Sequence, residues 1–351
     1  MDRSTPLSIT LLITLSLPLQ ANAHSKWFSR WQDNLEPATV GYLAQWSWLA
    51  LVVFALLAVF LSVCLWHSLP HGLGPRLTTL TDRVQNQSYY RILAIAAVMS
   101  IALCWRDGVI LTPELAHDSV LVSLIQFGLI TLGLLPQYRV LLPLLLASLY
   151  VVGAANVGPL HMLDYAHCLG IALCLWHWRA STGDRKIQEG LRILQITTGF
   201  SLCWLGMEKV IHPQWSLEVL ALKPWLSMGL PESFFVKSAA LVEFTIGFFL
   251  LTGLWTRLSA LILSLLMAFT ATLFGIQEIL GHLPIHAVLL VLIIAPVQPP
   301  AELASAARPP LIATAGRYTA LYLLVMATLG GVYYGFALQA CSAQGHCAPA
   351  A

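Results

Sequence analysis

Hydrophobic residues in this chain gather in long runs that short polar segments separate. After an N-terminal segment, ten such runs follow, at residues 43–65, 91–106, 118–135, 139–156, 162–178, 192–209, 237–253, 258–275, 282–296 and 318–336. A helix needs about 20 apolar residues to cross the hydrocarbon core of a bilayer. Several runs are shorter, so we expect some helices to be tilted or re-entrant. The pattern predicts an all-α polytopic membrane protein with about ten transmembrane helices.

The composition agrees with this class. Of the 351 residues, 58% are hydrophobic and 10% are charged, whereas a soluble domain carries about 25% charged residues. The formal net charge is +2 and the basic residues are spread over short loops, so we expect the lipid bilayer as a partner and no nucleic acid. The sequence contains no Walker loop, no glycine-rich dinucleotide fingerprint and no Cys-x-x-Cys motif.

Residues 1–23 have the pattern of a secretory signal peptide. Arg3 supplies the positive start, a short apolar core follows, and Ala21-Asn22-Ala23 fits the small-residue rule for cleavage. Cleavage would leave His24 as the mature N-terminus, and an uncleaved anchor helix is the alternative. Residues 24–90 would then contain the periplasmic N-terminus, the first transmembrane helix and a cytoplasmic loop.

The positions of Lys and Arg predict the orientation. With the mature N-terminus outside, eleven basic residues fall in inside loops and six in outside segments, as the positive-inside rule expects. Both termini are then periplasmic, in the inner (plasma) membrane of a bacterium. The last helix and tail, residues 297–351, end in an oxidising compartment, where Cys341 and Cys347 are suited to a small disulfide loop.

Two parts of the chain share a pattern that predicts an internal repeat. We expect two tandem four-helix units at 91–178 and 192–296, joined by a cytoplasmic linker at 179–191, with one flanking helix at each end. Each unit has one arginine in a tight inner turn, and a polar residue opens its fourth helix 25 positions later. These residues are Arg139 and Asp164 in the first unit, and Arg257 and His282 in the second.

Short motifs follow one another in the second unit. They are Arg192-Ile-Leu-Gln, Leu205-Gly-Met-Glu-Lys209 before His212-Pro213, Leu241-Val-Glu243-Phe-Thr-Ile-Gly247, Leu254-Trp-Thr-Arg257 and Glu278-Ile-Leu-Gly-His282. With these motifs, residues 192–296 resemble the DoxX family of small bacterial membrane proteins, and the first unit resembles it only faintly. The family includes a quinone-reducing subunit of thiosulfate oxidation, so the resemblance implies a redox-linked membrane subunit. This chain departs from that enzyme by an additional unit and an N-terminal helix.

The candidate site faces the predicted periplasm. Glu243 lies inside a span, where a carboxylate is costly unless it is paired, protonated or facing a wet cavity. Either Lys209 or Lys237 could pair with it, or Glu243 could accept protons beside a redox ligand. His282 and His286 are four residues apart and could hold a metal or a quinone carbonyl from one helix face, unless Pro284 makes His282 a helix cap. Further candidates to contact a cofactor are Glu208, Lys209, Glu278, Asp164 and His167.

Two other functions remain open from the sequence. In a metal-handling protein, the amine and imidazole of an N-terminal His24 would chelate copper(II), with imidazoles from His161, His167, His282 or His286 completing the site. In a non-catalytic scaffold, the protein would help a partner to assemble. Under the leading redox hypothesis, electrons need a partner protein or a diffusible carrier, because the sequence has no secure cluster or haem motif.

Overall fold

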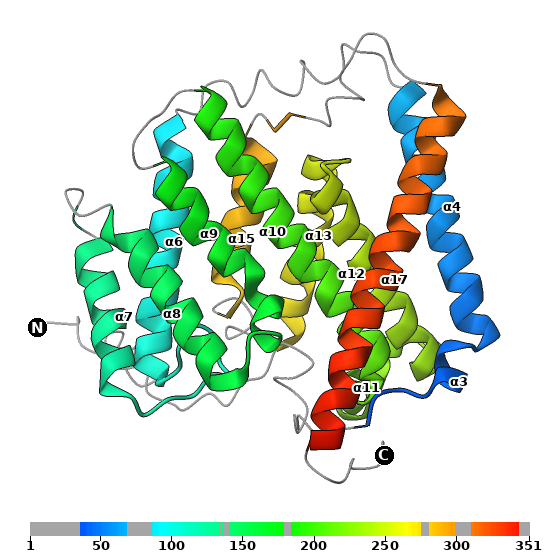
Figure 1. Ribbon diagram of the computed structural model, residues 1–351, viewed down its shortest axis with the longest axis horizontal. Coiled ribbons are helices and arrows are strands. Elements are labelled where there is room, and N and C mark those ends of the chain that lie inside the picture. Colours follow the sequence, from blue (N-terminus) through cyan, green and yellow to red (C-terminus); the bar gives the residue numbers. More distant parts are fainter. Residues whose placement is uncertain are drawn as a thin grey trace, which may run out of the picture.

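A computed structural model describes residues 36–68, 86–133, 135, 140–178, 184–274, 281–295, 297–298 and 310–343. All regular elements within these ranges are helices, and no strand occurs in them (Figure 1). The predicted all-α class is confirmed.

Each predicted apolar run coincides with a helix. These helices are α4 (Trp46–Ser68), α6 (Asn86–Asp107), α7 (Val120–Gly133), α8 (Leu141–Val157), α9 (Ala166–Trp178), α10 (Asp184–Ile211), α12 (Glu232–Thr252), α13 (Thr256–Phe274), α15 (Leu283–Ile294) and α17 (Leu311–Ala343). Shorter elements are α3 (Val40–Leu43), α11 (Pro213–Leu222) and the 3-10 helices η2 (His161–Tyr165) and η3 (Pro224–Ser227). Helix α10 begins before its predicted span, so part of the predicted linker is helical.

The helices differ in their capacity to cross a membrane. In the described ranges, five helices are long and apolar enough to do so: α4, α6, α12, α13 and α17. The apolar helices α7, α8 and α15 have 14, 17 and 12 residues. At a rise of about 1.5 Å per residue, α15 is about 18 Å long, which is less than the hydrocarbon thickness. The membrane class is confirmed, and ten complete crossings stay a prediction.

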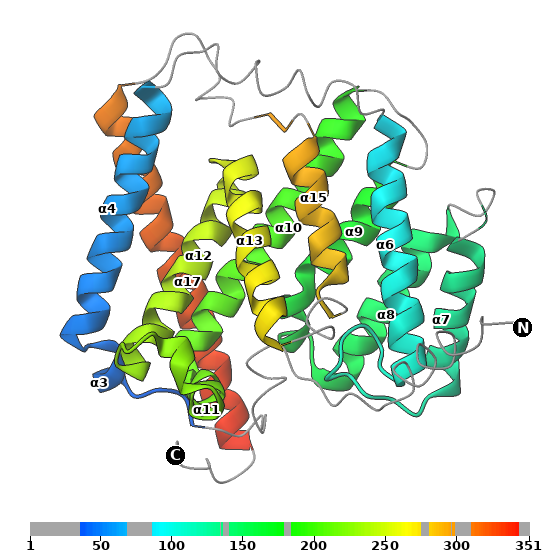
Figure 2. The same cartoon turned by 180° about the vertical axis from the view of Figure 1, so that it is seen from behind.

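Helix contacts follow the same order in the two predicted units. In the first, α6 contacts α7, α7 contacts α8, α8 contacts α9, and α9 returns to α6. In the second, α10, α12, α13 and α15 form the same closed series, and α9 and α6 pack against α10 and α15 between the units. The flanking helices α4 and α17 pack against each other and against α12 and α10 (Figures 1 and 2).

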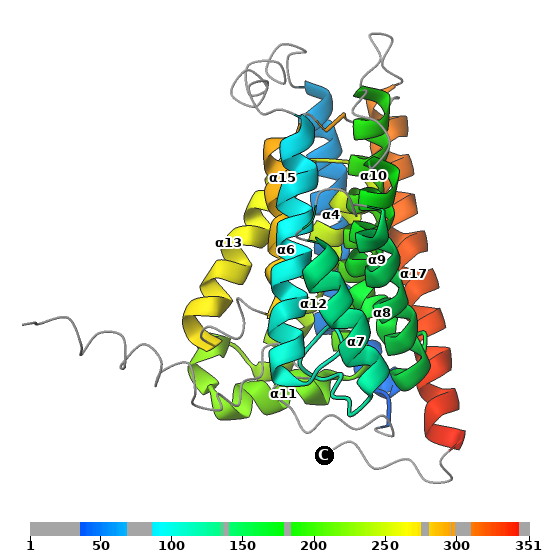
Figure 3. The ribbon, with the colours of Figure 1, turned by 90° about the vertical axis from the view of Figure 1, so that its left-hand side faces the viewer.

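The two ends of the bundle can be distinguished by the helices that begin and end there. We call the end where α10 stops and α12 and α15 begin the outer end, because it is the end predicted to face the periplasm, and the opposite one the inner end. Helix α11 lies across the outer end of the bundle, whereas the long helices run from one end to the other (Figure 3). At this end α11 packs against α10 and α12, the helices that hold Lys209 and Glu243.

Helices α10 and α12 approach each other backbone to backbone. A Cβ added at Gly199 would lie 2.4 Å from the Leu251 nitrogen, and one at Gly247 would lie 2.8 Å from the Cys203 nitrogen. Small residues allow such close approach between membrane helices. Helix α10 also contributes to both hydrophobic clusters of the molecule, through Leu194 in one and Met207 in the other. Because it also packs against α9, α12, α15 and α17, α10 is the central helix of the bundle.

Candidate functional site

The motif Leu205-Gly-Met-Glu-Lys209 lies at the outer end of α10. Its side chains reach different neighbours, because a helix turns by about 100° per residue. Gly206 faces α12, and Met207 packs in the hydrophobic cluster shared with α4 and α17. Glu208 reaches α17, and Lys209 reaches α12. One short motif thus joins three helices at one level of the bundle.

Glu208 belongs to a group of polar and aromatic side chains that we call the Glu208 cluster: Glu208, Trp204, His212, Trp215 and Tyr333. The Tyr333 hydroxyl donates a 3.0 Å hydrogen bond to Glu208 Oε2, and Glu208 is 1% exposed. The Tyr333 ring centroid lies 4.9 Å from that of Trp204 and 5.9 Å from that of His212. His212 stacks on Trp215 at 4.5 Å. A buried carboxylate stays charged only where donors compensate its lost hydration, so the Tyr333 bond helps to hold Glu208 in place.

The His212-Pro213 step builds one side of this cluster. Pro213 occupies the first turn of α11, where its missing N–H costs nothing, and His212 is the non-helical cap before it. The Gln214 side chain is 3.1 Å from His212 Nδ1. The Ala38 N–H donates to the Ile211 carbonyl at 2.7 Å, so the segment before α3 is fastened to the last turn of α10.

Lys209 and Glu243 form an ion pair between α10 and α12. Lys209 Nζ lies 2.6 Å from Glu243 Oε2, and their side chains are 18% and 21% exposed. Of the two lysines proposed from the sequence, Lys209 is thus the partner. Lys237 instead donates to Gln45 Oε1 at 2.6 Å and lies 3.8 Å from the ring centroid of Tyr42, whose pKa is raised by burial. Glu243 therefore lies in a compensated position rather than against lipid alone.

A second polar group lies at the interface between the two predicted units. Ser201 on α10 donates to the main-chain carbonyl of Asp164 in η2, and its hydroxyl is 3.3 Å from His167 Nδ1 on α9. His282 is close enough to His167 to interact with it electrostatically. Asp164 and His282, which hold matching positions in the predicted repeat, thus both lie near His167.

The outer corner of the first unit contains a separate carboxylate. His161 Nε2 lies 3.0 Å from Glu114 Oε1, and the Tyr165 hydroxyl donates to the same oxygen. The side chains of Glu114 and His161 are each 8% exposed. This contact occupies His161 Nε2, one of the two imidazole nitrogens through which the copper hypothesis could use this residue.

His282 is a helix cap, as the alternative based on Pro284 predicted. Its φ and ψ are −95° and 5°, Pro284 lies in the first turn of α15, and the His286 N–H donates to the His282 carbonyl at 2.9 Å. Both histidines are half-buried. Glu278, which the sequence placed beside them, lies outside the described residues.

The metal and disulfide candidates are only partly described. No group of three or more His, Cys, Asp or Glu among the described residues is arranged to hold a metal ion. His24 lies outside those residues. Cys341 is disulfide-bonded, whereas the described cysteines in the helices before α17 are free thiols. Cys347, its predicted partner, lies outside the described residues.

Several residues of the site escaped the sequence-based prediction. Tyr333 and Trp204 are aromatic residues inside apolar runs, and nothing local distinguishes them from core residues. Ser201 gave a weak signal, because it lies seven residues, about two helical turns, before the candidate Glu208 and therefore on the same face of α10. Glu114 lies in an outer loop and forms its contacts with residues 47 and 51 positions away.

Comparison with protein families gives one result. The DoxX family model matches residues 190–276, which run from α10 past the end of α13. The DoxX-like character predicted for this segment is confirmed. Comparisons with curated proteins and with solved structures found no match. Tyr333, Asp164 and His167 lie outside the matched segment, so both polar groups on α10 combine DoxX-like residues with residues from the rest of the chain.

Proposed function

We propose that this protein is a redox-linked subunit of a bacterial inner membrane that handles a quinone or a comparably small reductant at its outer end. The Glu208 cluster carries this proposal. It contains a carboxylate that is 1% exposed, a phenol bonded to it, two indoles and an imidazole. Ionisable residues at membrane depth are costly and default to a functional interpretation. The resemblance of the α10–α13 segment to DoxX proteins also supports a redox-linked function.

The chemistry of a quinone head group suits these side chains. Its carbonyl oxygens accept hydrogen bonds, which His212 and Lys209 can donate, while the Tyr333 hydroxyl donates its proton to Glu208. Its flat ring stacks on aromatic side chains such as Trp204 and Trp215. Reducing a quinone to a quinol takes two electrons and two protons, and the reverse reaction releases them. Glu208 exchanges the protons in this proposal, and a partner protein or a soluble reductant exchanges the electrons.

The other candidates take supporting roles. Glu243 is already compensated by Lys209, so its role is to orient the Lys209 ammonium group, and Glu208 replaces it as the proton-exchanging residue. His282 and His286 contact the part of the ligand that extends toward the interface between units. Glu208 and Ser201 lie about 10 Å apart along one face of α10, a distance that a substituted head group can bridge.

Quinone extraction and titration test the proposal. We expect quinone in organic extracts of the purified protein, by ultraviolet spectrum, and saturable binding of a short-chain quinone to the protein in nanodiscs. Glu208→Gln should weaken that binding about tenfold or more, since a hydrogen bond to a charged group is worth about 1.5–3 kcal/mol. Glu232→Gln, an exposed acid in the first turn of α12, is the matched control.

Two outcomes would reject the proposal. The first is a wild-type protein that binds no quinone, and the second is a Glu208→Gln variant that binds it as well as wild type. Metal analysis of the same sample addresses the copper hypothesis, which would be favoured by stoichiometric copper without quinone. Absence of both ligands would favour the scaffold.

A further inference from the structure

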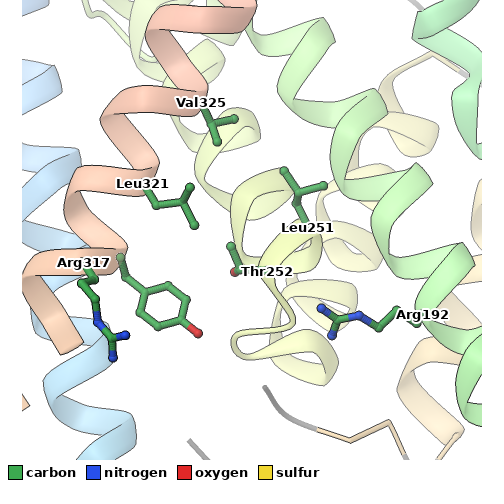
Figure 4. Close-up of a pocket in the computed structure, with 7 residues that line it drawn as sticks. Arg192, Leu251, Thr252, Arg317, Leu321 and Val325 are labelled. Atoms are coloured by element: carbon green, nitrogen blue, oxygen red, sulfur yellow. The ribbon is translucent and has the colours of Figure 1, made fainter. Parts of the chain in front are cut away.

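At the end of the bundle opposite the Glu208 cluster lies a pocket of about 590 Å³, whose lining residues Figure 4 draws as sticks. It lies between α10, α12 and α17, where the last helix leans against the DoxX-like segment. The described residues that line it are Arg192, Leu251, Thr252, Arg317, Tyr318, Leu321 and Val325. None of the residues that we propose to contact the quinone is among them.

The pocket has a charged part and an apolar part. Arg192 and Arg317 approach it from opposite walls at one level, and Leu321 and Val325 lie deeper, toward the middle of the bundle (Figure 4). Arg317, Leu321 and Val325 are spaced four residues apart, so they share one face of α17 and extend along it for about 12 Å. Such a lining fits an amphiphile with an anionic head and an apolar chain.

Two of the described residues that line the pocket, Arg192 and Arg317, are basic. No acidic residue occurs among the described lining residues. Glu189, one turn before Arg192 on α10, is held by Arg185 at 2.9 Å and by His177 at 2.8 Å. The Arg185 guanidinium is the main reason why the pKa of Glu189 is lowered. Arg192 makes no ion pair with any described residue, so its guanidinium group remains available to an anion.

Aromatic residues mark the depth of the pocket. Trp255 follows the end of α12, donates to the Ser62 carbonyl at 3.3 Å, and packs edge-on against Trp66 at 4.8 Å. Tryptophan is enriched at the boundary between lipid head groups and acyl chains. We therefore place the inner boundary of the bilayer at the level of Trp66 and Trp255, with the two arginines at the head groups and the apolar part of the pocket at the acyl chains.

We propose that this pocket binds an acidic phospholipid. Its phosphate lies between the Arg192 and Arg317 guanidinium groups, and one acyl chain runs along Leu251, Leu321 and Val325. A guanidinium group pairs with phosphate through two parallel hydrogen bonds, which makes arginine well suited to this role. The bound lipid bridges α10 and α17 and thereby stabilises the packing of the last helix on the DoxX-like segment.

Native mass spectrometry with lipid titration tests the proposal. We expect phosphatidylglycerol to bind more tightly than phosphatidylcholine. The double variant R192Q/R317Q should lose about twenty-fivefold in phosphatidylglycerol affinity, at about fivefold per arginine near an anionic surface, with phosphatidylcholine affinity unchanged. R192K/R317K keeps the charge without the paired hydrogen bonds and should lose less. R185Q, whose side chain is 90% exposed outside the pocket, is the matched control.

The same titration includes results that would overturn the proposal. Unchanged phosphatidylglycerol affinity in R192Q/R317Q would do so, provided that thermal unfolding in neutral lipid confirms a folded variant. Glycerol phosphate binding as tightly as phosphatidylglycerol would instead indicate a site for a soluble anion. Quinone binding should be unaffected by R192Q/R317Q, so the lipid site and the quinone site can fail separately.

Discussion

The Tyr333 hydroxyl on α17 donates to Glu208 Oε2 on α10 across 125 positions of sequence, at 3.0 Å. Glu208 lies inside the segment that matches the DoxX family model, and Tyr333 lies outside it. The last helix therefore completes a polar group that the matched segment contains only in part. This relationship makes α17 a component of the site rather than a peripheral anchor.

Removing the Tyr333 hydroxyl should destabilise the protein. In Tyr333→Phe the ring contact with Trp204 remains, but a buried carboxylate loses a donor. We expect a loss of about 2 kcal/mol in the free energy of unfolding, the usual range for a hydrogen bond to a charged group. Thermal unfolding in detergent measures it. Tyr334→Phe is the control, because the Tyr334 hydroxyl makes no hydrogen bond with described residues. Equal effects of the two variants would contradict a specific Glu208–Tyr333 bond.

Breaking the Lys209–Glu243 pair should reveal coupling between α10 and α12. Either Lys209→Met or Glu243→Gln leaves one partner uncompensated, which costs about 3–5 kcal/mol when a pair is fully buried. Partial exposure of both side chains reduces our expectation to about 2 kcal/mol for each variant. The double variant should lose clearly less than the sum. Additive losses in this double-mutant cycle would mean that the two side chains do not interact.

The close approach of α10 and α12 makes Gly247 intolerant of a larger residue. A Cβ there would lie 2.8 Å from the Cys203 nitrogen and the Gly199 oxygen, so backbone would have to move. Overpacking of this kind costs about 1–3 kcal/mol. Gly331→Ala on α17 meets nothing within 4 Å and should be neutral or slightly stabilising. A Gly247→Ala variant as stable as Gly331→Ala would show that the helices can separate without cost.

The predicted topology can be read with reporters and a thiol reagent. Fusions after residue 185 should report a cytoplasmic location, and fusions at the C-terminus a periplasmic one, because the basic residues favour the inside by eleven to six. A membrane-impermeant thiol reagent added from outside should label Cys341 only after reduction, since this cysteine is disulfide-bonded. A cytoplasmic C-terminus would overturn the orientation and the reason given for the disulfide.

Local pattern was sufficient for the helices and for part of the site. Apolar runs located each long helix, because a segment without polar groups satisfies its backbone in lipid only as a helix. The short motifs identified the DoxX-like segment, since their spacing is independent of distant residues. Pro284 suggested that His282 caps α15, because the effect of proline on a helix start is confined to one turn.

Pairing between helices was decided only by the tertiary structure. The sequence offered Glu243 two lysines, and the close α10–α12 contact brings Lys209 to it while Lys237 turns toward Gln45 and Tyr42. It singled out Glu208 without its partner Tyr333. The sequence marked Asp164 and His282 as matching positions of the predicted repeat. It did not show that both lie near His167 at the interface between the two units. Hydrophobic periodicity indicates which face of a helix is buried. The residue that a side chain on this face contacts depends on the crossing angle and the position of another helix, which is far away in the sequence.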